Sequence, residues 1–219
     1  MFKSEKSSKR VKMDCDKLRL VDIGNTHAKI YHKGRVEVVS SKDFDLKEEF
    51  FYISVYHDIA QKLSENNYAT NLADFIELKT TYKGLGVDRK VLCSYIDDGV
   101  IVDAGSAITV DVMSGGYHEG GFILPGVSAF FKAYEDISPA LKVQRAKTDI
   151  SKLPKTTQEA INYATFKSVV LMVKDISKDK KIYFCGGDGE ELSRYFEGSI
   201  YKKDLIFEAM KKIVREKIC

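Results

Sequence analysis

Long apolar runs are missing from this sequence of 219 residues. A membrane-spanning helix needs about 20 consecutive apolar residues, and no stretch comes near that length. The first 17 residues are basic, but no apolar segment follows them that could form the core of a signal peptide. We therefore expect a chain without a membrane partner, and we interpret residues 1–17 as a basic, flexible tail.

A strong excess of either charge is also missing. The chain has 35 Lys and Arg residues against 32 Asp and Glu residues, which gives a formal net charge of +3. Because nucleic-acid-binding proteins usually carry a concentrated basic face, this balance argues against a nucleic-acid partner. A hydrophobic fraction of 44% and a length of 219 residues suffice for one large or two small globular domains.

Spacings typical of metal ligands are missing as well. Neither the four cysteines nor the four histidines follow such a spacing, and we assign the histidines no role. Cys93 and Cys185 fall within apolar runs, so we expect buried, reduced thiols. Reduced thiols are typical of cytoplasmic proteins, and we predict that location.

Hydrophobic patterning divides the chain into strands and helices. Residues 18–40 predict a three-stranded antiparallel meander, because "GN" and "KG" separate three apolar runs with tight-turn residues. Further strands are predicted at 53–56, 74–79, 99–105, 107–114, 117–126 and directly before "CGGDG". Helices are predicted at 58–67, at 87–97, within 128–145, within 157–177, directly after "CGGDG" and at 204–218.

One pattern occurs twice. "LRLVDIGNTHAKIYHKGRVEVV" and "GVIVDAGSAITVDVMSGGYHEGGF" share a strand, Asp-x-Gly, a small polar residue, a strand, a glycine turn and a strand. The repeat predicts two copies of one α/β unit that face each other across a cleft. We place the domains at 18–98 and 99–219.

The two Asp-x-Gly turns have the composition of a nucleotide–metal clamp. A glycine lets a phosphate approach the backbone N–H groups, and a Ser, Thr or Asn side chain adds a donor. A carboxylate at the strand end can hold a hydrated divalent cation. The alternative is two ordinary hairpin turns whose Asp accepts local N–H groups. The residues concerned are Asp22, Gly24, Asn25 and Thr26 in the first turn, and Asp103, Gly105 and Ser106 in the second.

Three further stretches have alternative interpretations. In "YKGLGVDRK", Asp88 could take a proton from a substrate hydroxyl and Arg89 could pair with a substrate carboxylate. Equally, Asp88 could stabilise a helix start beside a surface arginine. "CGGDG" fits either a backbone approach to adenosine or a routine strand–helix turn, and Thr156 or Thr157 could cap a helix. "GGFILPG" predicts a strand that ends in a fixed loop.

Six motifs in this order resemble the type III pantothenate kinase family, a branch of the actin-like, RNase H-like phosphotransferase superfamily. They are "DIGNT", "GLGVDR", "DAGSAITVD", "GGFILPG", "TQEAI" and "CGGD", and they cover most of the chain. The resemblance implies two RNase H-like domains with mixed sheets flanked by helices and an active-site cleft between them. It also implies ATP-dependent phosphorylation of pantothenate to 4′-phosphopantothenate, the first step of coenzyme A biosynthesis, and a homodimer.

The resemblance also implies roles for individual residues. Asp88 would be the catalytic base, Asp22 would organise Mg²⁺ with ATP, and Asp103 would hold a monovalent cation, potassium or ammonium. Pantothenate would contact Tyr82, Gly86, Val87, Arg89 and Thr157. ATP would contact Asp22, Gly24, Asn25, Thr26, Lys29, Ser106, Gly186 and Gly187.

The chain departs from the family pattern in places. Ser106 stands where the family usually has Thr. The segment before "GLGVDR" is shorter than usual, and the match of Tyr82 to the family pattern depends on that segment. Two other functions stay open at this point. The chain could be a catalytically weak or inactive ligand-binding transcriptional regulator similar to the Bvg accessory factors, or an actin-like kinase for another small alcohol.

Overall fold

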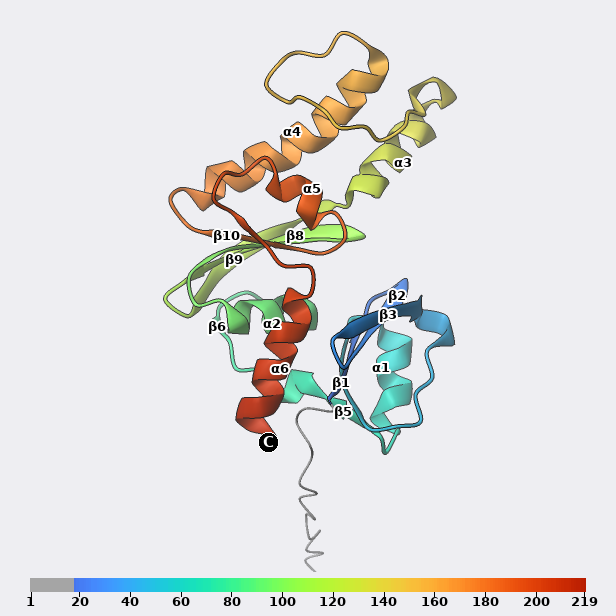
Figure 1. Cartoon of the computed structure of the whole chain (residues 1–219), viewed down its shortest axis with the longest axis vertical. Coiled ribbons are helices and arrows are strands. Elements are labelled where there is room, and N and C mark those ends of the chain that lie inside the picture. Colours follow the sequence, from blue (N-terminus) through green and yellow to red (C-terminus); the bar gives the residue numbers. More distant parts are fainter. Residues whose placement is uncertain (1–17) are drawn as a thin grey trace, which may run out of the picture. The chain divides into compact units, whose positions relative to one another are not determined.

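The structure, a computed structural model, describes residues 18–219, so the predicted basic tail at 1–17 lies outside the described residues. The described chain forms two compact units (Figure 1). One contains residues 18–75 with Met210–Cys219, and the other contains Ile76–Ala209. These units are defined by contacts, whereas the domains predicted at 18–98 and 99–219 are defined by a sequence repeat, and the two divisions need not have the same limits. The predicted domains and the cleft between them therefore stay predictions.

The first unit is built on a five-stranded mixed sheet of order β3-β2-β1-β4-β5. The predicted meander is confirmed, because β1, β2 and β3 are antiparallel neighbours. Strand β4 is parallel to β1, and helix α1 connects β4 to the parallel strand β5. The elements are β1 (Arg19–Ile23), β2 (His27–His32), β3 (Arg35–Ser40), β4 (Phe50–Ser54), α1 (His57–Ser64) and β5 (Ala69–Asn71).

Two strand predictions in this region need correction. The strand predicted at 53–56 begins earlier and ends at Ser54. The strand predicted at 74–79 is wrong, because Leu72–Phe75 forms a 3-10 turn and only β6 (Lys79–Thr80) pairs with a neighbour. The side chain of Asn71 accepts the backbone N–H of Ala73 at 3.0 Å, and this local bond favours a turn over an extended chain.

The second unit contains a six-stranded mixed sheet of order β11-β10-β7-β8-β9-β6. The strands and helices predicted between residues 87 and 193 are confirmed with small shifts at their ends, whereas the short strand at Ile200–Tyr201 was not predicted. The strands are β7 (Gly99–Ala104), β8 (Ala107–Ser114), β9 (Tyr117–Pro125), β10 (Ile182–Cys185) and β11 (Ile200–Tyr201). The helices are α2 (Val87–Tyr95), α3 (Val127–Ile137), α4 (Thr157–Ser177) and α5 (Gly189–Ser193).

The faces of this sheet carry different helices. Figure 1 shows α4 and α5 on one face and α2 on the other. Successive strand residues point to opposite faces, so the even-numbered residues of β7 and β8 face the core with α4. That buried core contains Val100, Val102, Ala104, Ile108, Val110, Phe166, Val169, Val170, Val173 and Phe184, among others. Asp103 and Asp111 are odd-numbered and lie on the α2 face.

Helix α6 (Leu205–Lys217) begins in the second unit and ends in the first. Its predicted apolar face is confirmed, because Leu205, Ile206, Ala209, Met210 and Ile213 are all buried. Cys93 and Cys185 are buried and form no disulfide, as expected. Among the described residues, no helix combines the length and the apolar character required to cross a membrane.

Candidate active site

The first Asp-x-Gly turn joins β1 to β2 in the first unit. The backbone N–H of Gly24 donates to the carbonyl of His27 at 3.0 Å, which closes the turn. Asp22 lies opposite Lys29 in the antiparallel register, and Lys29 Nζ is 3.5 Å from Asp22 Oδ2. The turn therefore presents a carboxylate and an ammonium group beside the partly exposed Gly24 and the exposed Asn25 and Thr26.

A serine that the sequence analysis missed supports this turn. Ser41 is fully buried, and its hydroxyl donates to the carbonyl of Gly24 at 2.7 Å. Its backbone N–H donates to the carbonyl of Thr26 at 3.1 Å. The two bonds fix both sides of the turn. No motif in the sequence distinguishes Ser41 from the neighbouring serine.

The second Asp-x-Gly turn joins β7 to β8 in the second unit. The backbone N–H of Gly105 donates to the carbonyl of Ala107 at 2.9 Å. Gly126, at the end of "GGFILPG", donates its N–H to the carbonyl of Ser106 at 3.2 Å. A Cβ atom at Gly126 would lie 2.5 Å from that carbonyl oxygen, so only glycine allows this approach. The "GGFILPG" segment thus ends directly against the turn.

The glycine turn of "CGGDG" lies beside the turn that joins β7 to β8. Gly186 has a φ of +81°, and a Cβ atom there would lie 2.5 Å from Asp103 Oδ1. The backbone N–H of Asp188 donates to the carbonyl of Ala104 at 2.9 Å. Asp103 and Ser106 come from one motif and Gly186 comes from another, and the structure brings them together at the ends of neighbouring strands in the second sheet.

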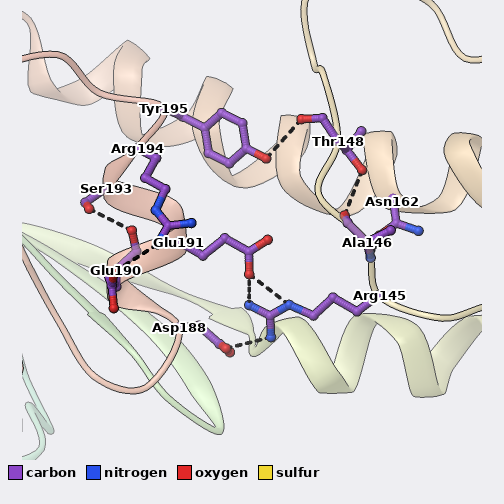
Figure 2. Close-up of polar contacts among 10 residues, drawn as sticks. All are labelled: Arg145, Ala146, Thr148, Asn162, Asp188, Glu190, Glu191, Ser193, Arg194 and Tyr195. Carbon is purple, nitrogen blue, oxygen red and sulfur yellow. Dashed lines mark hydrogen bonds and ion pairs between the residues drawn. The ribbon is translucent and has the colours of Figure 1, made fainter.

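An arginine cluster anchors this glycine turn (Figure 2). Arg145 Nη1 donates to Asp188 Oδ1 at 2.7 Å, and Arg145 Nε donates to Glu191 Oε2 at 3.0 Å. Nearby, the hydroxyl of Tyr195 donates to the carbonyl of Thr148 at 3.2 Å. The loop before α4 is therefore hydrogen-bonded to α5 and to Asp188, the residue that follows Gly186 and Gly187. The sequence analysis did not single out Arg145.

The start of α2 holds Asp88 in a defined position. Asp88 Oδ1 accepts the backbone N–H of Arg89 at 2.8 Å. A Cβ atom at Gly86 would lie 2.6 Å from that oxygen, so glycine at 86 makes room for the carboxylate. Burial raises the pKa of Asp88 above its ordinary value, and the charge of Asp111 adds to this rise, while Arg89 opposes it.

Arg89 is buried, so the interpretation of a surface arginine is wrong. Its side chain is 4% exposed, and that of Asp111 is 3% exposed. Arg89 Nε donates to Asp111 Oδ2 at 2.9 Å and Nη2 donates to Oδ1 at 2.7 Å, which is a bidentate pair. Burial lowers the pKa of Arg89, but the bonds to Asp111 raise it more, so the guanidinium stays charged.

Tyr82 completes this group. Its ring centroid is 4.9 Å from the guanidinium carbon of Arg89, and its hydroxyl accepts from Nη1 at 3.4 Å. Val87 is the first residue of α2. The structure therefore brings together five predicted substrate or catalytic residues, namely Tyr82, Gly86, Val87, Asp88 and Arg89.

Thr157 lies elsewhere in the same unit. It is the first residue of α4, on the opposite face of the sheet from α2 (Figure 1). The helix cap is Thr156, whose hydroxyl accepts the backbone N–H of Glu159 in a capping box. Thr157 itself is exposed, and its hydroxyl is not the capping group.

Asp111, His118 and Thr80 form a part of the site that sequence reasoning missed. An aspartate inside the apolar run "AITVDVMS" was the available signal, because a buried carboxylate requires partners. Cys93, Asp111 and His118 place three ligand atoms within 4.8 Å of one another, as a metal site would. However, Arg89 already neutralises Asp111, and burial raises the pKa of the Cys93 thiol, which keeps it protonated. The cluster is a hydrogen-bond network.

Known proteins share this architecture and sequence. Residues 57–179 match the sequence model of type III pantothenate kinase. A type III pantothenate kinase from Helicobacter hepaticus is 45% identical over 91% of this chain and 99% of its own length. Another from Campylobacter jejuni is 41% identical over 90% of this chain and 96% of its own.

Solved structures agree. A structure described as a candidate Baf family transcriptional activator from Campylobacter jejuni superposes with a TM-score of 0.85 at 40% identity, covering 91% of this chain and 98% of that one. A candidate 2-dehydro-3-deoxygalactonokinase from Sinorhizobium meliloti gives a TM-score of 0.55 at 7% identity, covering 91% and 96%, and shows the fold alone.

Two mixed sheets flanked by helices, with a matching Asp-x-Gly turn in each sheet, define an actin-like ATPase fold, and the predicted fold class is confirmed. Within that class, the identity to curated relatives over nine-tenths of the sequence is decisive. The chain belongs to the type III pantothenate kinase family.

Proposed function

We propose that Asp88 is the general base in the reaction of this pantothenate kinase, the ATP-dependent phosphorylation of pantothenate in coenzyme A biosynthesis. The observation that supports this role is the position of its carboxylate, half-buried at the start of α2 and one residue before the buried Arg89. A raised pKa makes the carboxylate a better proton acceptor. Asp88 takes the proton of the pantothenate hydroxyl. The oxygen of that hydroxyl attacks the γ-phosphorus of ATP, and the bond between this phosphorus and the bridging oxygen of ADP breaks.

Arg89 and Tyr82 hold pantothenate in this proposal. Because Asp111 binds Nε and Nη2 of Arg89, the Nη1 group beside Tyr82 is the part of the fork nearest to solvent-exposed residues. A guanidinium nitrogen suits a carboxylate or carbonyl oxygen of the substrate. Gly86 and Val87 line the same place through their backbone.

ATP is bound with Mg²⁺, as in other kinases of this class. Asp22 has the hard oxygen ligands that this ion prefers, and Lys29 adds a positive charge for phosphate. Gly24, Asn25 and Thr26 offer backbone N–H groups and two polar side chains. Ser106, Gly186 and Gly187 contact the rest of the nucleotide. Phosphoryl transfer depends mainly on such positioning and on neutralised charge.

Asp103 holds a monovalent cation, potassium or ammonium, in this proposal. Its Oδ1 lies beside Gly186, near the carbonyl oxygen of Ala104. Carboxylate and carbonyl oxygens are suitable ligands for a hard cation. The cation would offset negative charge near the nucleotide, and no step of proton transfer depends on it.

A homodimer explains how Thr157 contacts pantothenate in this proposal. Since α4 and α2 cover opposite faces of one sheet, Thr157 and Arg89 can contact one pantothenate only if Thr157 comes from a second copy. Exposed apolar residues on α4 and on the neighbouring helix α3, namely Leu171 and Met172 on α4 and Ile137 on α3, support a protein interface there. We further propose a cytoplasmic enzyme with no nucleic-acid and no membrane partner.

The test is ADP release from ATP with and without pantothenate, in potassium buffer and again in sodium buffer. Release that requires pantothenate and potassium is the expected result. Pantothenate dependence without potassium dependence would remove the cation from Asp103 and keep the kinase. No pantothenate dependence in either buffer would overturn the kinase assignment.

The second candidate function is a ligand-binding transcriptional regulator. The name of the Campylobacter jejuni structure favours it. The half-buried carboxylate of Asp88, with its raised pKa, favours catalysis, because a binding protein does not need a base. Loss of pantothenate turnover together with retained pantothenate binding would move the regulator to first place.

A further inference from the structure

A β-bulge determines which face of the sheet His118 occupies. Strands β8 and β9 pair in register up to Val112 and Gly120, and then the register shifts so that Met113 faces His118. Side chains alternate between faces, so a shift by one residue moves His118 to the other face. Without the bulge, His118 would lie opposite Ser114, away from the face of Asp111. Gly120 has a φ of +147°, which glycine adopts readily.

On that face, His118 connects two polar groups. Its side chain is fully buried, and Nε2 is 2.8 Å from Asp111 Oδ1. Its Nδ1 is 2.8 Å from the hydroxyl of Thr80, the residue that pairs with it on β6. An ionised Asp111 only accepts, so Nε2 donates to it, and in the neutral imidazole Nδ1 then accepts from the hydroxyl of Thr80. The neutral imidazole satisfies both partners.

The network ends at both residues that are proposed to hold the substrate. At one end, Asp111 binds two nitrogens of Arg89. At the other, the hydroxyl of Thr80 accepts the backbone N–H of Tyr82 at 3.0 Å, and the Tyr82 ring lies 5.8 Å from the imidazole. Arg89 is on a helix and Tyr82 is in a loop, so His118 links the two segments through Asp111 and Thr80, in addition to the direct contact between Arg89 and Tyr82.

We propose that His118 and Thr80 are positioning residues for pantothenate, acting through Arg89 and Tyr82. This inference rests on the proposed function of those two residues. In this proposal His118 does not contact a reacting atom. It affects only the positions of the Arg89 guanidinium and the Tyr82 ring. Its loss should therefore weaken the interaction with pantothenate and leave the interaction with ATP intact.

Thr80→Val is the first test, because it removes one hydroxyl at nearly constant volume. We expect the KM for pantothenate to rise about five- to tenfold, because the hydrogen bonds of the hydroxyl to His118 and to Tyr82 are lost, with the KM for ATP unchanged within twofold. Thr165→Val is the matched control. Thr165 is buried in α4 of the same unit, and among the described residues its hydroxyl has no hydrogen-bond partner. This control should keep both KM values.

Substitutions of His118 test the connection itself. His118→Phe removes both hydrogen bonds of the imidazole, including the one to the buried carboxylate of Asp111, and should raise the KM for pantothenate more than Thr80→Val does. His118→Gln keeps a donor for Asp111 and should recover part of the loss. A purely structural role would instead change both KM values and the melting temperature together. That outcome, in Thr80→Val as well as in the His118 variants, would overturn the proposal.

The outcomes also separate this inference from the proposed function. If the wild-type enzyme phosphorylates pantothenate and the variants keep the wild-type KM for pantothenate, the positioning role alone is overturned. Wild-type enzyme without pantothenate turnover would overturn the proposed function and the positioning role with it. A selective rise in the KM for pantothenate supports both.

Discussion

Arg89 donates its backbone N–H to Oδ1 of Asp88 at 2.8 Å, while its guanidinium binds a different carboxylate, that of Asp111. The two neighbours in sequence are therefore joined through the main chain and not through a side-chain ion pair. Arg89 lowers the pKa of Asp88 through this hydrogen bond and through its charge, while burial and the charge of Asp111 raise that pKa. Burial dominates, and the pKa of Asp88 is raised.

Replacing Asp88 by Asn should remove most of the activity. General-base catalysis contributes about 100- to 10,000-fold, so kcat/KM should fall by about that factor. The amide oxygen can still accept the N–H of Arg89, so the fold should be kept. Asp97→Asn, an exposed aspartate shortly after the same helix, is the control. A turnover close to that of the wild type in Asp88→Asn would contradict the role of base.

The same substitution should stabilise the protein at neutral pH. The pKa of Asp88 is raised from an unfolded value of 3.8, so the folded state favours the protonated form. This contribution to stability is complete below pH 3.8 and is lost as the pH rises through the folded pKa. Asp88→Asn avoids that loss, and each kcal/mol corresponds to about 2–4 °C in Tm for a chain of this size. The gain in Tm should shrink between pH 7 and pH 4.

The activity of the wild type should fall on the acidic side at a higher pH than an ordinary aspartate predicts. The base must be deprotonated, so a raised pKa moves the acidic limb of kcat/KM above pH 3.8. Steady-state rates between pH 4 and pH 8, with circular dichroism to verify folding, measure this limb. A midpoint at or below 3.8 would assign the limb to another group.

Gly121→Ala should disturb the site from the neighbouring strand. A Cβ atom there would lie 2.0 Å from the carbonyl oxygen of Val110 and 2.9 Å from Arg89 Nη2. Overpacking of this kind typically costs about 1–3 kcal/mol of the free energy of unfolding, and we also expect a higher KM for pantothenate. Gly116→Ala is the control. It sits in a hairpin turn with a φ of +77° and no atom within 4 Å, so it measures the backbone cost alone.

The sequence predicted elements best where local chemistry decides them. The turns "GN" and "KG" determine the first meander, and the capping pattern around Thr156 starts α4. The stretch at 74–79 has strand-like composition, but the side chain of Asn71 turns the chain just before it. That bond depends on a single amide, which periodicity does not detect.

The candidate site was predicted in part for a similar reason. Asp88, Arg89 and Tyr82 are close in sequence, and the structure brings them together as expected. Asp111 and His118 are ordinary strand residues until a bulge places them on one face. A one-residue shift of register cannot be read from hydrophobic alternation, so this half of the site became visible only in three dimensions.

The limits of the first unit have a consequence for synthesis on the ribosome. Residues 18–75 emerge early, but the helix segment Met210–Cys219 that belongs to the same unit follows only after Ile76–Ala209. At a translation rate of about 5–20 residues per second, the first sheet waits for several seconds or longer. During that interval, the first unit lacks the segment in which Met210 and Val214 are buried in the finished fold. The first unit can therefore be completed only after the second has been synthesised.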